Sequence, residues 1–227
     1  MKITPERLGQ AAGLCAAAAG AIFVLVQINH PAMNLDTVTT SEWVVRSTAK
    51  LLMTALALVG ITGIYLRQFR QVGVMGLIGY LLFSLGYLAM LGVEVVAAFV
   101  LPALTESDPG FVSDILRAAA GGSTVGDIGL MQVVLSISGI GYMVGGLVFG
   151  IAIFRAGVQA KWAAALLAAG TISTLALSVL PEAFNRFFAL PVGVALVGLG
   201  LSLWKDQRSR GAEVEATVAN LEPAPTR

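Results

Sequence analysis

Long apolar runs dominate this chain and constrain its fold more than any other feature. A helix of about 20 apolar residues is long enough to cross the hydrocarbon core of a bilayer. Inside a bilayer each backbone N–H and C=O group must be paired within the protein, and a helix pairs them within one segment. The sequence therefore predicts an all-α, polytopic transmembrane bundle of about six spans, near residues 8–29, 42–66, 72–101, 126–154, 161–180 and 186–204.

The last predicted span contains Pro191, which lacks a backbone N–H group and disturbs a helix. A kinked or re-entrant final segment is therefore the alternative to a straight sixth span. The amino-terminal run is too long for a signal peptide, and no A-x-A cleavage pattern closes it. We interpret that run as the first span.

The composition agrees with a lipid-facing exterior. Of the 227 residues, 57% are hydrophobic and 12% are charged, whereas soluble domains have about 25% charged residues. The formal net charge is +1, and the basic residues form short clusters instead of one stripe, which argues against nucleic-acid binding. Cys15 is the only cysteine, so one chain can form neither an intrachain disulfide nor a cysteine-built metal site.

The distribution of lysine and arginine predicts the orientation of the bundle. Cytoplasmic loops of membrane proteins carry an excess of these residues. One set of run ends holds most of them, namely Lys2, Arg7, Arg67, Arg70, Arg155, Lys161, Lys205, Arg208 and Arg210. We therefore expect both termini in the cytoplasm, with a transmembrane domain over residues 1–204. Residues 205–227 lack aromatic side chains and an apolar period, which predicts a disordered cytoplasmic tail.

The loops predict two further features. Residues 67–71 and 155–160 are short connections, so the spans that they join should pair as antiparallel hairpins. The longer connection on the other side contains a helix signal over residues about 109–120, either lying on the outer membrane face or sealing the bundle as a lid. Its signal consists of Asp108 as cap, Pro109 at the first position, Phe111, Ile115 and Leu116 on one side, and Gly121 and Gly122 as the stop.

Ionisable residues near the outer ends of the second and third spans form the main polar constellation. Glu42, Arg46 and Lys50 follow one another at four-residue spacing, so they lie along one side of a helix. Counted from Phe69, the centre of the predicted turn, Arg46 is 23 residues away, Glu94 is 25 and Lys50 is 19. Arg46 and Glu94 thus differ in depth by about 3 Å, and Lys50 and Glu94 by about 9 Å. We predict an Arg46–Glu94 ion pair, with Lys50 able to reach Glu94 only by extending upward.

Other polar side chains could share an outward-facing pocket with this pair. Tyr87 precedes Glu94 by seven residues, Gln132 lies in the fourth predicted span, and His30 ends the first. Ionisable groups at membrane depth are costly and often mark ligand or ion pathways, but they also fix the register of packed helices. The candidate ligand or ion-binding residues are Arg46, Lys50, Glu94, Tyr87, Gln132 and His30.

Several chemistries have no support in the sequence. A single histidine excludes a zinc site with two histidines and bis-histidine haem ligation within one chain. The H-E-x-x-H, G-x-S-x-G and Walker A patterns do not occur. We therefore expect a protein that is not an enzyme, with no metal and no cofactor.

Glycines at four-residue spacing predict close helix packing. Small residues at this spacing let helix backbones approach in lipid. The pairs are Gly9 and Gly13, Gly141 and Gly145, and Gly146 and Gly150. The same faces could instead join two copies of the chain as a homo-oligomer.

From Ile137 onward the chain resembles a family of uncharacterised bacterial six-helix inner-membrane proteins. The resemblance is carried by GLVFGIAIFRAGVQAKWAAALLAAG and by a final helix ending in LSLWKDQR. The third span, GYLLFSLGYLAMLGVEVV, also matches the family's glutamate at Glu94, although Met90 and Leu91 stand where the family has an arginine. The resemblance implies six spans in a bacterial inner membrane and no known activity.

Two classes of function follow from these observations. The first is a non-enzymatic membrane protein with an outward-facing pocket for a lipid head group or small molecule, or a structural subunit of a membrane assembly. The second is a small proton- or cation-coupled transporter that uses Glu94.

Overall fold

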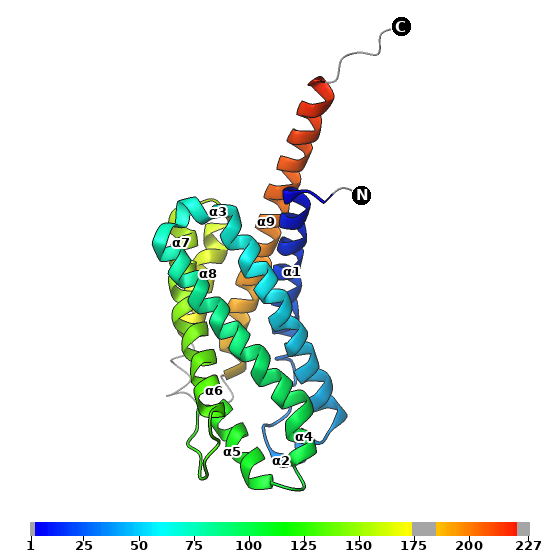
Figure 1. Ribbon diagram of the computed structural model, residues 1–227, viewed down its shortest axis with the longest axis vertical. Helices are drawn as coiled ribbons and strands as arrows, with labels where there is room; N and C mark the ends of the chain where they lie inside the picture. The colour runs from blue at the N-terminus through cyan, green and yellow to red at the C-terminus, as the bar shows by residue number, and fades with distance from the viewer. Residues whose placement is uncertain (1–2, 174–184, 222–227) are drawn as a thin grey trace.

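The computed structural model describes residues 3–173 and 185–221, and each regular element among them is helical. In chain order, the elements are α1 (Pro5–Leu25), α2 (Leu35–Val38), α3 (Ser41–Val95), the π-helix η1 (Val96–Val100), α4 (Leu101–Leu104), α5 (Pro109–Ala119), α6 (Met131–Ile140), the π-helix η2 (Gly141–Gly145), α7 (Gly146–Ala156), α8 (Lys161–Ser173) and α9 (Asn185–Leu221). The long helices pack side by side into one bundle (Figure 1). The prediction of an all-α fold is confirmed for the described residues.

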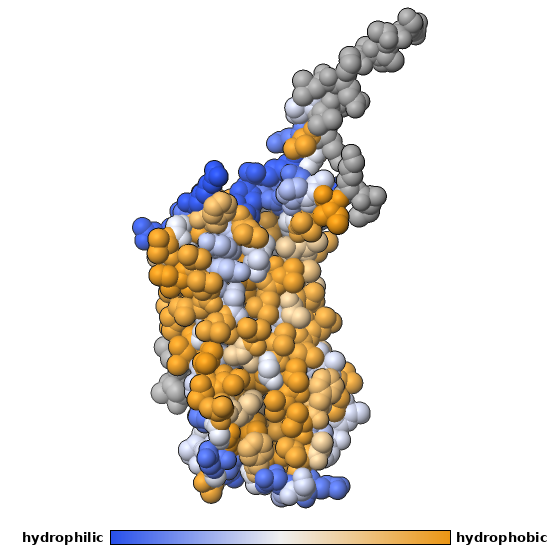
Figure 2. All heavy atoms as spheres, in the orientation of Figure 1, coloured by the Kyte–Doolittle hydropathy of each residue, from blue (hydrophilic) through white to orange (hydrophobic). Residues whose placement is uncertain are grey.

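An apolar belt surrounds the bundle. Figure 2 shows hydrophobic side chains over its length and hydrophilic ones gathered at both ends. Four stretches of the described residues are long and apolar enough to cross a membrane, namely Pro5–Leu25, Ser41–Leu104, Met131–Ala156 and Ala189–Val214. Large apolar side chains remain exposed along them, as expected where lipid replaces water; examples are Leu14, Leu52, Val59, Leu66, Leu81 and Leu88.

α3 is a hairpin of two helices. Its helical geometry is broken at Gln68 and at Gly73, whose φ of +58° suits glycine. We call residues 41–67 the first arm and 74–95 the second arm. The rings of Tyr65 and Tyr80 stack at 4.4 Å, and the Tyr80 hydroxyl lies 3.2 Å from that of Thr62 across the arms. The predicted antiparallel pairing is therefore confirmed here, and α7 and α8 pair in the same way.

The bundle has two distinct ends (Figure 1). α1 begins and α9 ends at one of them, which we call the terminal end. The turn of α3 lies at this same end. α2, α4 and α5 lie at the opposite end, which we call the α5 end.

α1 and α9 approach closely because glycine leaves room for backbone contact. A Cβ atom on Gly20 would lie 2.3 Å from the carbonyl oxygen of Gly193, and one on Gly13 would lie 2.7 Å from that of Gly200. The glycines predicted to mediate packing do so within this chain, since Gly145 faces Phe83 and Gly150 faces α8. Small residues thus hold the helices together where no hydrophobic force draws them out of lipid.

The predicted disordered tail is wrong for residues 205–221, which continue α9 as a helix. Arg67 donates two hydrogen bonds to the carboxylate of Asp206, the second at 2.8 Å. Gln207 is buried where α9 passes Gly9 of α1. These contacts extend the helix beyond its apolar segment, and no proline follows before Pro223. Residues 222–227 lie outside the described part.

Other predicted boundaries also shift. The span expected from residue 126 begins at Met131, because residues 123–130 form a loop in which Gly129 has a φ of +59°. α9 runs through Pro191 as one helix, so a re-entrant segment is not formed in the described residues. The predicted span 161–180 is helical to Ser173, and its remainder lies outside the described residues.

The contact between α1 and α9 predicts the effect of a single methyl group. Gly20→Ala should lower the free energy of unfolding by about 1–3 kcal/mol, because the new Cβ overlaps the α9 backbone. Thermal unfolding in detergent measures this loss. Gly92→Ala is the matched control, since Gly92 is exposed with open space around its Cβ position. Equal melting temperatures for the two variants would contradict the predicted close contact.

Candidate ligand-binding cavity

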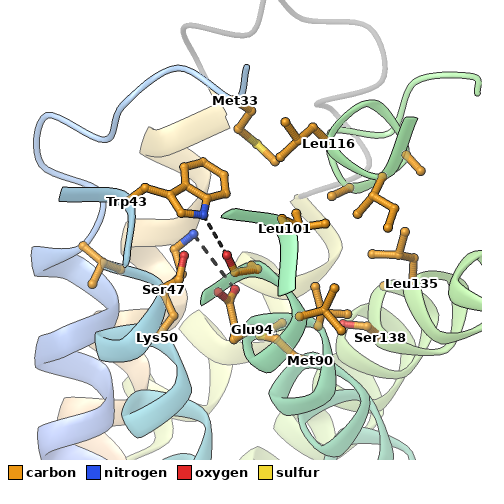
Figure 3. A pocket seen from close by; sticks show the side chains of 18 of the residues that line it. Met33, Trp43, Ser47, Lys50, Met90, Glu94, Leu101, Leu116, Leu135 and Ser138 are labelled. Carbon is orange, nitrogen blue, oxygen red and sulfur yellow. Dashed lines mark hydrogen bonds and ion pairs between the residues drawn. The ribbon is translucent and has the colours of Figure 1, made fainter. Parts of the chain in front are cut away.

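A cavity of about 510 Å³ lies within the α5 end of the bundle. α1, both arms of α3, η1, α4, α5 and α6 contribute its walls. The polar residues in its lining are few, and the others are mainly aliphatic or methionine side chains (Figure 3). The polar set is Gln27, Ser47, Lys50, Glu94 and Ser138, together with the indole of Trp43.

α5 forms a lid over this cavity. It begins at Pro109, where the Asp108 carboxylate accepts a hydrogen bond from the Phe111 N–H at 3.1 Å. Its buried side, Val112, Ile115 and Leu116, joins a core with side chains that include Val38, Trp43, Leu101 and Ile128. The predicted amphipathic helix is therefore confirmed, and the side that it buries packs on the bundle as in the lid interpretation.

Lys50 and Glu94 face each other across the cavity. Their side chains come from the two arms of α3, and the Lys50 Nζ lies 4.0 Å from a Glu94 carboxylate oxygen (Figure 3). The side chains are 21% and 12% exposed, respectively. This distance marks an ion pair that is too long for a direct hydrogen bond.

The predicted Arg46–Glu94 pair is wrong. Arg46 instead binds Glu42 at 2.9 Å and donates hydrogen bonds to the carbonyl oxygens of Val26 and Ile28 at 3.2 and 2.8 Å. These carbonyls follow the end of α1, where backbone acceptors lack helical partners and attract a cation. Arg46 is therefore drawn toward α1 and does not line the cavity.

The position of the α3 turn explains why Lys50 reaches Glu94. The break lies between Gln68 and Gly73, so its centre at 70.5 is 20.5 residues from Lys50 and 23.5 residues from Glu94. A difference of three residues corresponds to about 4.5 Å along a helix, which an extended lysine side chain can span. The sequence-based count took Phe69 as the centre of the turn and therefore overestimated the difference in depth between Lys50 and Glu94.

Trp43 supplies the hydrogen bond that Pro102 cannot. η1 has π-helical pairing, in which the N–H of residue 102 would donate to the carbonyl of Ala97. Pro102 has no N–H, and the Trp43 indole donates to the Ala97 oxygen instead, at 2.8 Å. Trp43 is only 4% exposed, so this bond joins the first arm of α3 to η1 inside the bundle.

The other predicted site residues lie apart from the cavity lining. Tyr87 is buried against Phe83 and Tyr142, and its hydroxyl has no hydrogen-bond partner among the described residues. Gln132 lies on a separate groove of about 300 Å³ between α6 and the second arm. The His30 Nδ1 lies 2.8 Å from the Pro31 carbonyl oxygen, and the ring packs edge-on to Trp43.

Sequence reasoning missed Trp43, Ser47 and Ser138 as parts of the site. Pro102 could have indicated the role of Trp43. A proline has no N–H group, so it leaves a helix carbonyl that needs a hydrogen-bond donor from elsewhere. Ser47 lies between the predicted candidates Arg46 and Lys50 but is an ordinary helix residue in the sequence. Only the packing of the arms and α6 reveals that both serines face the cavity.

A carboxylate fastens the loop after α5 to the lid. Asp114 accepts hydrogen bonds from the backbone N–H groups of Val125 at 3.0 Å and Gly126 at 2.7 Å. These bonds hold the pKa of Asp114 below its ordinary value, and Arg117 adds a weaker effect from 3.8 Å. The loop 121–130 is thereby tied to the outer side of α5.

The cavity combines a charged pair with mainly apolar walls. Among the described residues, no three His, Cys, Asp or Glu side chains gather closely enough to hold a metal ion. No family model matches the chain, and no curated protein or solved structure is significantly similar to it. Its role is therefore inferred from the cavity.

Removing the indole N–H should weaken the junction between the first arm and η1. Trp43→Phe keeps an aromatic ring but leaves the Ala97 carbonyl unpaired, at a cost of about 1–3 kcal/mol in the free energy of unfolding. Thermal unfolding measures the loss, and hydrogen exchange should increase locally around η1. Trp162→Phe at an exposed position is the control. Unchanged exchange around η1 in Trp43→Phe would contradict the structural role of this bond.

The lowered pKa of Asp114 predicts a pH-dependent loop. Its carboxylate stabilises the loop fully above about pH 4, the ordinary range for aspartate, and this contribution disappears as the pH falls through the lowered folded-state pKa. The amides of Val125 and Gly126 should lose protection from hydrogen exchange in that lower range, after correction for intrinsic exchange rates. Asp114→Asn should leave them less protected already at pH 7, with no corresponding acid transition.

Proposed function

We propose that this chain is a non-enzymatic, six-span protein of a bacterial inner membrane that binds a lipid head group or small molecule in its outward-facing cavity. The observation that carries the proposal is the Lys50–Glu94 pair, which faces about 510 Å³ of space with mainly apolar walls. A few convergent polar groups in an apolar hollow are typical of a ligand site.

The span count and the orientation rest on separate observations. α1, the two arms of α3, the continuous α6–η2–α7 helix, α8 and α9 supply six segments in the expected order. Arg67 precedes the α3 turn, Arg155 lies in the last turn of α7, Lys161 begins α8, and Lys205 adjoins Asp206, which binds Arg67. The α3 turn lies at the terminal end (Figure 1). The positive-inside rule assigns that end to the cytoplasm. The resemblance of the sequence to bacterial inner-membrane proteins supports the same placement.

The geometry of two ion pairs separates a binding role from a purely structural one. Arg67 and Asp206 form two direct hydrogen bonds, as expected for a pair that fastens helices. Lys50 and Glu94 remain 4.0 Å apart, so the ammonium and the carboxylate retain hydrogen-bonding capacity toward the cavity. Charges at membrane depth are costly when incompletely paired, and a polar ligand would satisfy both groups.

A transporter that uses Glu94 is the second candidate. Glu94 lies just before η1, and π-helical turns frequently occur at functional sites. Proton or cation coupling would require the carboxylate to exchange its ion between the two sides of the membrane. Ion flux into vesicles, measured for the native chain and for Glu94→Gln, distinguishes this activity from binding alone.

The binding proposal predicts a co-purifying molecule. Native mass spectrometry of the full chain, gently extracted from its membrane, should give a reproducible bound mass. Glu94→Gln should lose at least about tenfold in occupancy, because it removes a charged partner. Glu42→Gln is the matched control, since Glu42 is mostly exposed and lies outside the cavity lining.

A structural role would produce a different pattern. Glu94→Gln would then lower the melting temperature without affecting any bound mass, and a second change, Lys50→Gln, would restore part of the loss. That result would overturn the binding proposal. The native chain found bare in repeated preparations would overturn it as well.

A further inference from the structure

We infer that the cavity is selective for a zwitterionic amphiphile whose head group carries a primary ammonium beside an anionic oxygen group, as in a phosphoethanolamine lipid. This inference rests on the proposed binding function and names the chemistry of its ligand. It draws on the charges of the cavity, its hydrogen-bonding groups and its apolar walls.

The two charges of the cavity favour a ligand with both signs. Lys50 and Glu94 come from different arms of α3 and point toward one another into the same space (Figure 3). An anionic ligand would pair with Lys50 but be repelled by Glu94, and a cationic ligand would meet the reverse situation. A zwitterion can place its anionic oxygens at Lys50 and its ammonium at Glu94, so all four charges gain an opposite neighbour.

Hydrogen-bonding groups favour a primary ammonium over a quaternary one. A primary ammonium needs acceptors, and the Glu94 carboxylate, the hydroxyls of Ser47 and Ser138 and the Gln27 side chain provide them. Ser47 and Ser138 are 2% and 8% exposed, and both line the cavity. Quaternary ammonium groups are usually held in aromatic cages. The described lining contains only two aromatic residues, Phe23 and Trp43.

The remaining walls favour an amphiphile over a small water-soluble zwitterion. Apolar side chains surround the charged pair from several helices, namely Met53, Met90, Leu101, Ile115, Leu116 and Leu135. A hydrocarbon segment next to the head group would bury against them. At α6 the lining includes Gly139, which is exposed and has open space at its Cβ position. An acyl chain can leave the cavity there toward the membrane.

Lipid exchange into nanodiscs, followed by native mass spectrometry, tests this chemistry. The full chain is placed in bilayers with equal amounts of phosphatidylethanolamine, phosphatidylcholine and phosphatidylglycerol of identical acyl chains. We expect phosphatidylethanolamine to be retained over each competitor by about tenfold, because of the three head groups only its ammonium is both positively charged and able to donate hydrogen bonds to Glu94. Glu94→Gln and Lys50→Gln should each abolish this preference.

Two controls separate the cavity from general lipid contact. Gln132→Leu changes the outer groove of α6 and should leave the preference intact. Soluble glycerophosphoethanolamine, added in excess, should compete poorly because it lacks the acyl chain. The melting temperature of each variant verifies its fold, and titration with phosphatidylethanolamine should raise the melting temperature of the native chain but not of Glu94→Gln.

Each contrary outcome has a distinct meaning. Equal retention of the choline lipid would overturn the preference for a primary ammonium, because that lipid is also zwitterionic. Selective retention of the glycerol lipid would overturn the zwitterion inference. Either result would leave the proposed binding function in place. Strong competition by the soluble compound would overturn the requirement for an acyl chain. A preference that survives in Glu94→Gln would place the lipid outside the cavity. A cavity that retains no ligand of any kind would overturn both proposals.

Discussion

Backbone groups within an apolar belt must find their partners inside the protein, and most of this structure follows from that requirement. Helices satisfy most of these groups within one segment. Several exceptions among the described residues occur where a helix ends or deforms near the α5 end. There the Ala97 carbonyl receives the Trp43 indole, and the carbonyls after α1 receive Arg46. The backbone N–H groups of the outer loop use Asp114 in the same way.

These side-chain bonds also frame the cavity. Trp43 and Arg46 fasten the beginning of the first arm to η1 and to α1, respectively. After these two attachments along the chain, Ser47 and Lys50 face the cavity from the same arm. The π-helical turn η1 begins two residues after Glu94, and α5 covers the cavity. The cavity is therefore framed by hydrogen bonds and lined by apolar side chains, with one charged pair left incompletely satisfied.

The two ends of the bundle use charge in different ways. At the terminal end, Arg67 and Asp206 fasten the α3 turn to α9 through direct hydrogen bonds. At the α5 end, Lys50 and Glu94 remain at ion-pair distance beside empty volume. Close glycine contacts join α1 and α9 in the middle of the bundle, where small residues replace a hydrophobic driving force. The bundle is thus closely packed between α1 and α9 and hollow at the α5 end.

The sequence by itself determined the helical class, the apolar segments, the α3 hairpin and the capped helix over Pro109–Ala119, because apolar length, turn residues and caps are local signals. It also identified Lys50 and Glu94 as costly charges. Tertiary structure decided that Lys50, and not Arg46, faces Glu94. It also decided that Tyr87 and Gln132 lie outside the cavity lining and that residues 205–221 remain helical. The physical reason is that several partners compete for the same polar groups. The carbonyls after α1 bind Arg46 in place of Glu94, and contacts of Asp206 and Gln207 with neighbouring helices stabilise the end of α9. Such choices depend on which groups meet in space, which a pattern along one chain does not specify.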